Sequence, residues 1–294
     1  MPAKIPSSVR SDANELTVRN LEQSDLEPLF ERLANELPKL DTLVLHGMRG
    51  KRFSELPRNV GKLVRLRKLA LRDSRLKTLP PEIGNLERLI ALRVEFSAIE
   101  TLPAELVACQ ALQLLEIRKG ALASFPAVIP ALRGLRSLDI YEHRIDRLPE
   151  EIGRLENLEW LQLGLNRIRE LPAAITALRR LRALALDGNK LTRLPSDLGV
   201  LRKLRSLTLN GNKIAELPES IGALAELHTL WLCGNAMRDL PLATLGRLRK
   251  LRSIMLDEER FPQDTVKAVD AIAANNTKVH GPAIWESEPL KLAF

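Results

Sequence analysis

Few side chains in this sequence belong to types that do covalent or acid–base chemistry. Cys233 could act as a nucleophile if a nearby base and a positive field lowered the thiol pKa, and His143 could exchange protons near neutral pH. The sequence pairs Cys233 with no obvious base. It also contains no glycine-rich phosphate loop, paired-histidine metal motif or nucleophile elbow. We therefore expect no catalytic residues, no cofactor and no bound metal, and the chain is predicted not to be an enzyme.

Recognition of another macromolecule is a second kind of chemistry, and it favours large rigid side chains and arginines on an exposed surface. Six Phe, three Trp and one Tyr are the aromatic residues of the 294-residue chain. The core must then be built from aliphatic side chains, and each aromatic ring needs its own explanation. Whether Phe96, Tyr141, Trp160 and Trp231 are exposed depends on the elements that carry them.

A proline that recurs every 23 residues organises the chain. It stands at positions 57, 80, 103, 126, 149, 172, 195, 218 and 241, and leucine precedes it everywhere except at Phe125. The frame between the prolines repeats as well. Leu184-x-Leu186 has the alternation of a short half-buried strand, and Pro195-x-x-Leu198-x-x-Leu201 has the spacing of a short helical or 3-10 segment. One such unit cannot bury its leucines alone, so the units must stack.

With these residues in this frame, the chain resembles the leucine-rich repeat family, specifically its 23-residue LPxxIxxLxxLxxLxLxxNxLxx class. The resemblance covers residues 40–262. It implies an α/β solenoid with a parallel β-sheet on the concave side, short helical or 3-10 segments on the convex side, and helical caps at both ends. We expect one domain.

The ends of the chain depart from the repeat, as terminal caps do. Residues 1–39 are predicted to form an N-terminal cap, with a strand at 16–18 and a helix to about Leu37 that opens on a capping box at 24–27. Residues 263–294 are predicted to form a C-terminal cap, with a helix from Thr265 to Ala274 that ends at Asn275 and Asn276. The tail 279–294, with Trp285, is predicted to cover the last repeat.

The recurring polar column after each strand is predicted to be structural. Asn166, Asn189, Asn212 and Asn235 occupy it in the later repeats, and the resemblance implies that their amides form a ladder of hydrogen bonds to the turns. In the earlier repeats the same column holds Ser74, Ser97, Gly120 and His143, so we expect those turns to be less uniformly satisfied. His143 is then a substitute for a ladder asparagine. Cys109 stands in a leucine column and should be buried, whereas Cys233 should face outward.

The residues between the leucines of each strand should point away from the core, as should the two residues before the polar column. Three of the four Tyr and Trp residues fall at such positions. We therefore predict a partner-binding surface on the concave face, with a mixed-charge patch around apolar anchors. Its predicted residues are Arg93, Glu95, Phe96, Glu116, Arg118, Asp139, Tyr141, Glu142, Trp160, Gln162, Leu165 and Trp231.

The net charge of +8 leaves an alternative open. Basic residues gather where the convex segments end, for example at Arg179, Arg180 and Arg202, and acids gather where these segments begin. The helix dipole favours this distribution on a solvated surface. It could also form a basic edge that binds an anionic membrane or nucleic acid. Against nucleic acid, no aromatic platforms alternate with the bases.

The predicted function is that of a protein–protein interaction module whose partner the sequence does not name. The resemblance extends to intracellular adaptors and to bacterial effectors that act in host cells. The N-terminus lacks a secretory apolar segment. The sequence also contains no stretch of 18 or more apolar residues, the length that a membrane-spanning helix needs. We expect a monomer in the cytoplasm, either of the cell that makes it or of a host cell.

Overall fold

Each repeat folds as a short strand, a turn and a short 3-10 helix, because its leucines can be buried on one side only. The computed structural model describes residues 14–47 and 53–280. These residues form two compact units. The first ends at His143 and the second begins at Arg144, and each is described separately. Residues 48–52 and the predicted tail after residue 280 lie outside the described residues.

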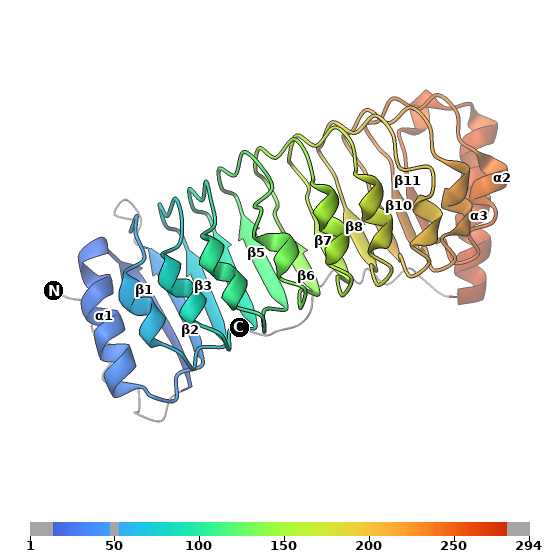
Figure 1. Cartoon of the computed structure of the whole chain (residues 1–294). Coiled ribbons are helices and arrows are strands. Elements are labelled where there is room, and N and C mark those ends of the chain that lie inside the picture. The colour runs from blue at the N-terminus through green and yellow to red at the C-terminus, as the bar shows by residue number, and fades with distance from the viewer. Residues whose placement is uncertain (1–13, 48–52, 281–294) are drawn as a thin grey trace. The chain divides into compact units, whose positions relative to one another are not determined.

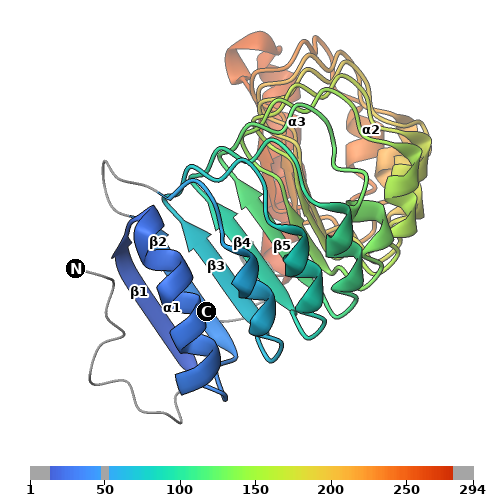
Figure 2. The same cartoon turned by 60° about the vertical axis from the view of Figure 1, so that its left-hand side comes forward.

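The strands of the first unit form a parallel sheet in sequence order (Figure 1). They are β1 (Glu15–Leu21), β2 (Thr42–Gly47), β3 (Lys68–Arg72), β4 (Ala91–Glu95), β5 (Leu114–Arg118) and β6 (Ser137–Asp139). The opposite side carries α1 (Gln23–Glu36), η1 (Arg58–Lys62), η2 (Pro81–Asn85), η3 (Ala104–Ala108) and η4 (Ile129–Ala131), as Figure 2 shows for the part nearest the viewer.

The second unit repeats this plan. Its strands are β7 (Trp160–Gln162), β8 (Ala183–Ala185), β9 (Ser206–Thr208), β10 (Thr229–Trp231) and β11 (Ser253–Met255), and neighbouring strands pair in parallel. Its helices are η5 (Glu150–Arg154), η6 (Ala173–Ala177), η7 (Leu198–Val200), η8 (Glu219–Ala223), α2 (Leu242–Leu245), η9 (Glu258–Arg260) and α3 (Gln263–His280).

The repeat proline ends the extended segment and starts the 3-10 helix. Pro57 is the N-cap of η1 with φ −70° and ψ 150°, and its carbonyl accepts the N–H of Val60 at 3.0 Å. Proline suits this position because its ring fixes φ at about −65°. It also has no N–H that would need a hydrogen-bond partner at the start of a helix. The pattern differs in three repeats: η4 and η7 begin three residues after Pro126 and Pro195, and Pro241 is followed by the α-helix α2.

The leucine columns form the core of each unit. Leu69, Leu92, Leu115 and Leu138 are fully buried in the first unit, and Leu161, Leu184, Leu207 and Leu230 are buried in the second. Fold class and leucine burial therefore agree with the sequence prediction of a leucine-rich repeat solenoid, with a parallel sheet on one side and short helical segments on the other.

The helix boundaries of both caps differ from the prediction. The capping box of α1 uses Glu22 rather than Ser24, because Glu22 is the last extended residue and its N–H donates to the Asp25 carboxylate at 2.9 Å. At the other end, α3 continues through Asn275 and Asn276. The Asn276 amide donates to the carbonyls of Leu248 and Leu251 at 2.9 and 2.8 Å, so it attaches the helix to the last repeat instead of ending it.

Candidate partner-binding face

The register of the first unit's sheet aligns oppositely charged side chains across neighbouring strands. Arg93 on β4 lies beside Glu116 on β5, which lies beside Asp139 on β6. Two residues further along, Glu95 on β4 has Arg72 on β3 and Arg118 on β5 as its neighbours. Since neighbouring strands in a sheet are about 4.8 Å apart, these side chains are within reach of one another.

The aligned charges form ion pairs across the strands. Arg93 Nε lies 2.6 Å from Glu116 Oε2, and Arg72 Nε lies 2.9 Å from Glu95 Oε2. Arg118 Nε donates to Asp139 Oδ2 at 2.7 Å, and its Nη2 also contacts that oxygen. Arg118 Nη1 lies 3.9 Å from Glu95 Oε1, which is too long for a hydrogen bond.

Two of the acids in this network are buried, contrary to the prediction that they lie on an exposed surface. Glu116 is 2% exposed and Asp139 is 1% exposed. Alternation along the strand does turn both away from the leucine core, but the longer arginines of neighbouring strands pair with them. Burial raises the pKa of both carboxyls, and the paired arginines act in the opposite direction. Glu116 and Asp139 therefore hold arginines in place rather than offering themselves to a partner.

The apolar anchors of the first unit are accessible. Phe96 is 47% exposed, and Tyr141 is half-buried and does not enter the leucine core. Lys119 Nζ lies 4.6 Å from the centre of the Phe96 ring and 3.8 Å from Glu142 Oε2, so a cation connects the aromatic ring to the exposed acid. Phe96, Lys119 and Glu142 thus form a row at the end of β4, β5 and β6.

This row has an unusual backbone conformation. Asp73, Phe96, Lys119 and Glu142 stand directly before the polar column of their repeats, and all have φ between 53° and 62°. Residues other than glycine, asparagine and aspartate seldom adopt this left-handed region. In the second unit the equivalent residues are Leu165, with φ 51°, and then Gly188, Gly211 and Gly234. The first unit therefore keeps large side chains where glycine would be relaxed.

The remaining predicted binding residues belong to the second unit. Trp160 and Gln162 lie on β7, where both are half-buried, and Leu165 is 43% exposed in the turn that follows. The Gln162 side chain accepts the N–H of Gly164 at 2.8 Å and so is partly engaged in its own turn. Trp231 on β10 is half-buried, with its indole N–H 3.4 Å from the Ser253 hydroxyl oxygen.

The asparagine ladder exists as predicted. Asn189 Oδ1 accepts the N–H of Ile168 at 3.0 Å, and its Nδ2 donates to the carbonyls of Leu186 and Leu163 at 2.9 and 3.0 Å. Asn212 and Asn235 repeat the pattern in the next turns. In the earlier turns the ladder is weaker, since the buried Ser74 hydroxyl has no hydrogen-bond partner among the described residues.

His143 takes the place of a ladder asparagine, as predicted. Its Nδ1 accepts the N–H of Leu122 at 3.2 Å, which puts the proton on Nε2, and Nε2 lies 2.8 Å from the Ile117 carbonyl oxygen. The ring is larger than an amide, and glycine at position 120 makes room for it: a Cβ there would lie 2.5 Å from His143 Cε1. The histidine is committed to the scaffold.

Comparison with known proteins agrees with the repeat fold described above. A family model described as "Leucine-rich repeat region" matches residues 127–204, and one described as "Leucine Rich Repeat" matches residues 203–224. Residues 127–224 are therefore leucine-rich repeats by sequence, and the fold is that of a leucine-rich repeat solenoid. No curated protein sequence matches it.

Several solved structures resemble this leucine-rich repeat protein. A chain from the octameric complex of latrophilin 3, Unc5D and the leucine-rich repeats of FLRT2 is 22% identical, with a TM-score of 0.71 over 88% of this chain and 79% of that one. Internalin C2 of Listeria monocytogenes is 24% identical, with a TM-score of 0.60, over 67% of this chain and 83% of that one. The plant peptide hormone receptor RGFR1, in complex with RGF2, is 26% identical, with a TM-score of 0.63, over 76% of this chain but only 41% of the receptor chain.

The two cysteines of the repeat protein lack the surroundings of a nucleophile. Cys109 is buried, as predicted, with its Sγ 3.3 Å from the Ile83 carbonyl oxygen, and burial raises the pKa of its thiol to about 11. Cys233 is half-buried, and burial together with nearby acids raises its pKa too. Within residues 14–47 and 53–280, no group of three or more histidine, cysteine or acidic side chains could hold a metal ion, and no helix is long and apolar enough to cross a membrane.

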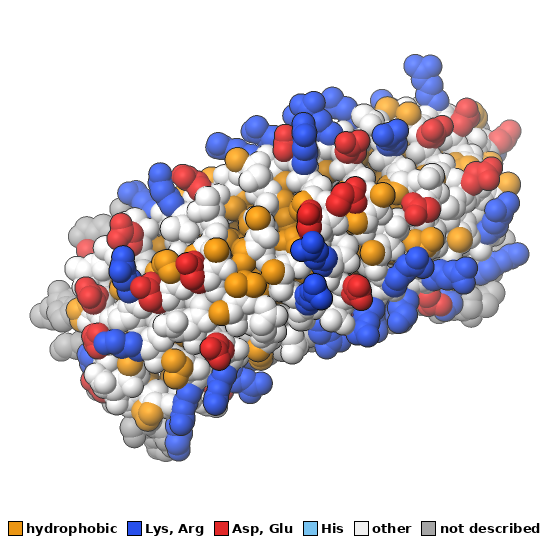
Figure 3. Space-filling view, in the orientation of Figure 1, with side chains coloured by type: hydrophobic (Ala, Val, Ile, Leu, Met, Phe, Trp, Pro, Cys, Tyr) orange, Lys and Arg blue, Asp and Glu red, His pale blue; other side chains and the backbone are white. Residues whose placement is uncertain are grey.

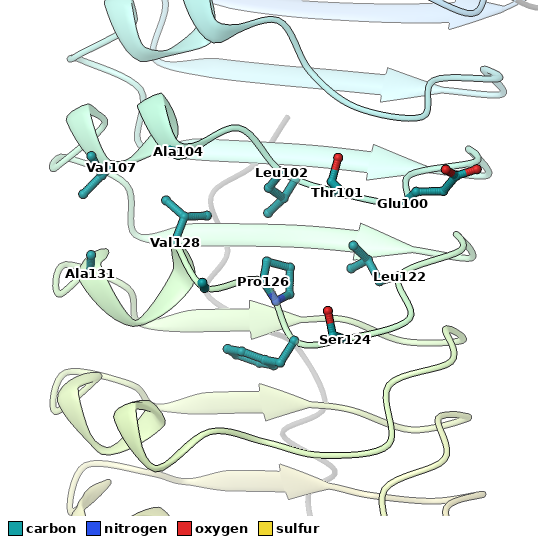
Figure 4. Close-up of a pocket in the computed structure, with 12 residues that line it drawn as sticks. Glu100, Thr101, Leu102, Ala104, Val107, Leu122, Ser124, Pro126, Val128 and Ala131 are labelled. Atoms are coloured by element: carbon teal, nitrogen blue, oxygen red, sulfur yellow. The ribbon is translucent and has the colours of Figure 1, made fainter.

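A cleft opens on the helical side of the first unit where η4 begins late. It has a volume of about 480 Å³ and lies between the segment that follows β4 and the one that follows β5 (Figure 4). Its apolar lining includes Leu102, Val107, Leu122, Phe125 and Val128. A cleft of about 610 Å³ opens beside η7 in the second unit, where four acids line it. Figure 3 shows this helical side, with apolar side chains at the surface among basic and acidic ones.

Proposed function

We propose that this leucine-rich repeat protein is a protein-interaction module and that the outward face of its sheet, the concave side of the solenoid, binds a protein partner. The observation that carries the proposal is the row of exposed Phe96, Lys119 and Glu142, held in left-handed conformations beside Tyr141. Left-handed backbone strain in large residues is concentrated at functional sites, because glycine would otherwise be favoured there.

The structural relatives support this class of function. Leucine-rich repeat folds typically serve interaction rather than catalysis, and the solved structures include a receptor with its peptide hormone and a multi-protein complex. Large rigid side chains such as Phe96 and Tyr141 lose little rotamer freedom on binding, which is why aromatic residues dominate interface energies. No catalytic step is part of the proposal.

Photo-crosslinking on the intact chain tests the position of the binding face. A photoreactive phenylalanine analogue replaces Phe96 in one protein and Val64, a 54% exposed residue after η1 on the helical side, in a second. In the cells that make the protein, the probe at position 96 should yield a discrete cross-linked species that the probe at position 64 does not. Equal cross-linking from both positions, or from position 64 only, would refute the sheet face as the binding site.

The alternative from the sequence, a basic edge that binds an anionic membrane or nucleic acid, makes an opposite prediction. Arg179, Arg180 and Arg202 are exposed in the second unit. Binding through such an edge should weaken by orders of magnitude between about 50 and 200 mM salt, whereas binding through aromatic anchors should largely persist. A complex that dissociates over this range and does not respond to changes at Phe96 would favour the basic edge.

A further inference from the structure

The charges on the sheet face of the first unit are unequally accessible. Arg72, Arg93 and Arg118 are matched in number by Glu95, Glu116 and Asp139. The side chains of Glu116, Asp139 and Glu95 are 3%, 1% and 16% exposed, whereas those of Arg72 and Arg118 are 34% and 37% exposed; Arg93, at 18%, lies about as deep as Glu95. A partner that approaches this face therefore meets guanidinium groups before it meets carboxylates.

The buried acids also fix the orientation of the guanidinium groups. Asp139 holds Arg118 through Nε and Nη2, which leaves Nη1 at 3.9 Å from its other acid, beyond hydrogen-bond distance. Arg72 contacts Glu95 through Nε. An arginine whose rotamer is already fixed loses less conformational entropy when a carboxylate pairs with it, so pre-oriented arginines favour binding.

We propose that the partner segment docked on this face is an acidic peptide, with its carboxylates received by Arg72, Arg118 and Lys119 and an apolar side chain packed on Phe96 and Tyr141. The inference rests on the proposed function and adds the chemistry of the partner. Lys119 extends the positive surface to the exposed row, since it is 43% exposed and touches both Phe96 and Glu142. An extended segment can run across neighbouring strands and contact Arg72, Arg118 and Lys119 in turn, which a folded acidic surface would do less well.

A displayed library of random twelve-residue peptides, selected on the purified full chain, tests the proposal. Selected peptides should be enriched in aspartate and glutamate and should carry an aromatic or aliphatic residue. Arg72→Gln with Lys119→Gln should weaken the binding of a selected peptide at least tenfold. The matched control Arg179→Gln with Arg180→Gln makes the same change of net charge at exposed positions of the second unit and should change the affinity less than twofold.

Arg118 needs a paired change, because its loss alone would leave Asp139 buried without a cation. Arg118→Gln with Asp139→Asn removes both charges, and it too should weaken peptide binding while the chain stays folded. Selected peptides without acidic enrichment would overturn the acidic-peptide inference and leave the proposed function standing. So would equal losses of affinity from Arg72→Gln with Lys119→Gln and from the control Arg179→Gln with Arg180→Gln.

Two further probes separate the peptide from other anions. Vesicles that contain phosphatidylserine and a twenty-nucleotide single-stranded DNA are offered to the wild-type chain, to Arg72→Gln with Lys119→Gln and to the control Arg179→Gln with Arg180→Gln. The proposal expects weak binding that both double variants reduce alike. Tight binding of either probe that only the sheet-face variant abolishes would show a general anion site and would contradict the assignment to a peptide. If no peptide is selected at all and the cross-link at Phe96 also fails, the proposed function falls with the inference.

Discussion

His143 is of a residue type that often takes part in catalysis, but here its hydrogen bonds support the fold. Its ring nitrogens serve the Leu122 N–H and the Ile117 carbonyl, the same kinds of backbone groups that an asparagine amide serves in the later turns. His143→Ala should lower the free energy of unfolding by about 1–3 kcal/mol, because both backbone groups would be buried without partners. Gly120 belongs to the same arrangement, since any larger residue would meet the ring.

Burial lowers the pKa of His143, which makes stability depend on pH. Because the unfolded chain binds a proton on this ring at higher pH than the folded chain does, the free energy of unfolding should be fully retained above about pH 6.5 and should fall as the pH drops toward the folded-state pKa. Urea unfolding of wild type and His143→Asn at pH 7.5 and pH 5.0 measures this loss, and the variant should lose less.

The other described histidines do not confuse the comparison. Burial lowers the pKa of His46 and His228 as well, but both titrate in wild type and in His143→Asn, so their contributions cancel. An equal loss of stability with pH in the two proteins would show that His143 takes up its proton at the same pH in the folded and unfolded chains, contrary to a lowered pKa in the folded chain.

At the scale of the elements, the turns that follow the strands fall into two groups: strained turns with a non-glycine residue at positive φ, and relaxed turns with glycine there. Gly211 has φ 65° at no steric cost, and Phe96 has φ 53° in the equivalent turn of another repeat. A left-handed conformation costs an L-residue about 1–2 kcal/mol. Glycine avoids this strain, but its greater freedom in the unfolded chain lowers the free energy of unfolding by about 0.5–1 kcal/mol.

Phe96→Gly should therefore leave the protein as stable as wild type or up to about 1 kcal/mol more stable, while it removes an anchor of the binding face. Gly211→Ala, the matched change in the opposite direction, should lower the free energy of unfolding by about 1 kcal/mol. Chemical denaturation of both variants checks the pair. A clear loss of stability in Phe96→Gly would mean that the ring is there to support the fold.

The elements also show what a sequence of this kind can and cannot predict. The proline period and the leucine spacing predict the strands, the 3-10 helices and the buried columns, because each repeat must bury the same side. The burial of Glu116 and Asp139 depends on arginines one strand away, which a single repeat does not contain. The left-handed turns at Phe96 and Lys119 escaped the prediction for a different reason: glycine marks such turns only in the later repeats.

At the scale of the whole molecule, stability and recognition lie on opposite sides of the same strands. Inward leucines such as Leu92 and Leu115 are fully buried, and the outward side carries the paired charges and the exposed rings. Large side chains on the outward side can therefore change without loss of core packing. This separation is the central claim, and it distinguishes a binding face from an extension of the core.

The measurement that tests the claim most directly compares stability and binding in Phe96→Ala with Tyr141→Ala. The protein recovered by cross-linking at position 96 serves as the binding probe, and Val64→Ala is the control for loss of an exposed apolar side chain. The account predicts a melting temperature within about 2 °C of wild type and a dissociation constant at least tenfold higher in the double variant only. An unchanged dissociation constant in a folded double variant would contradict it.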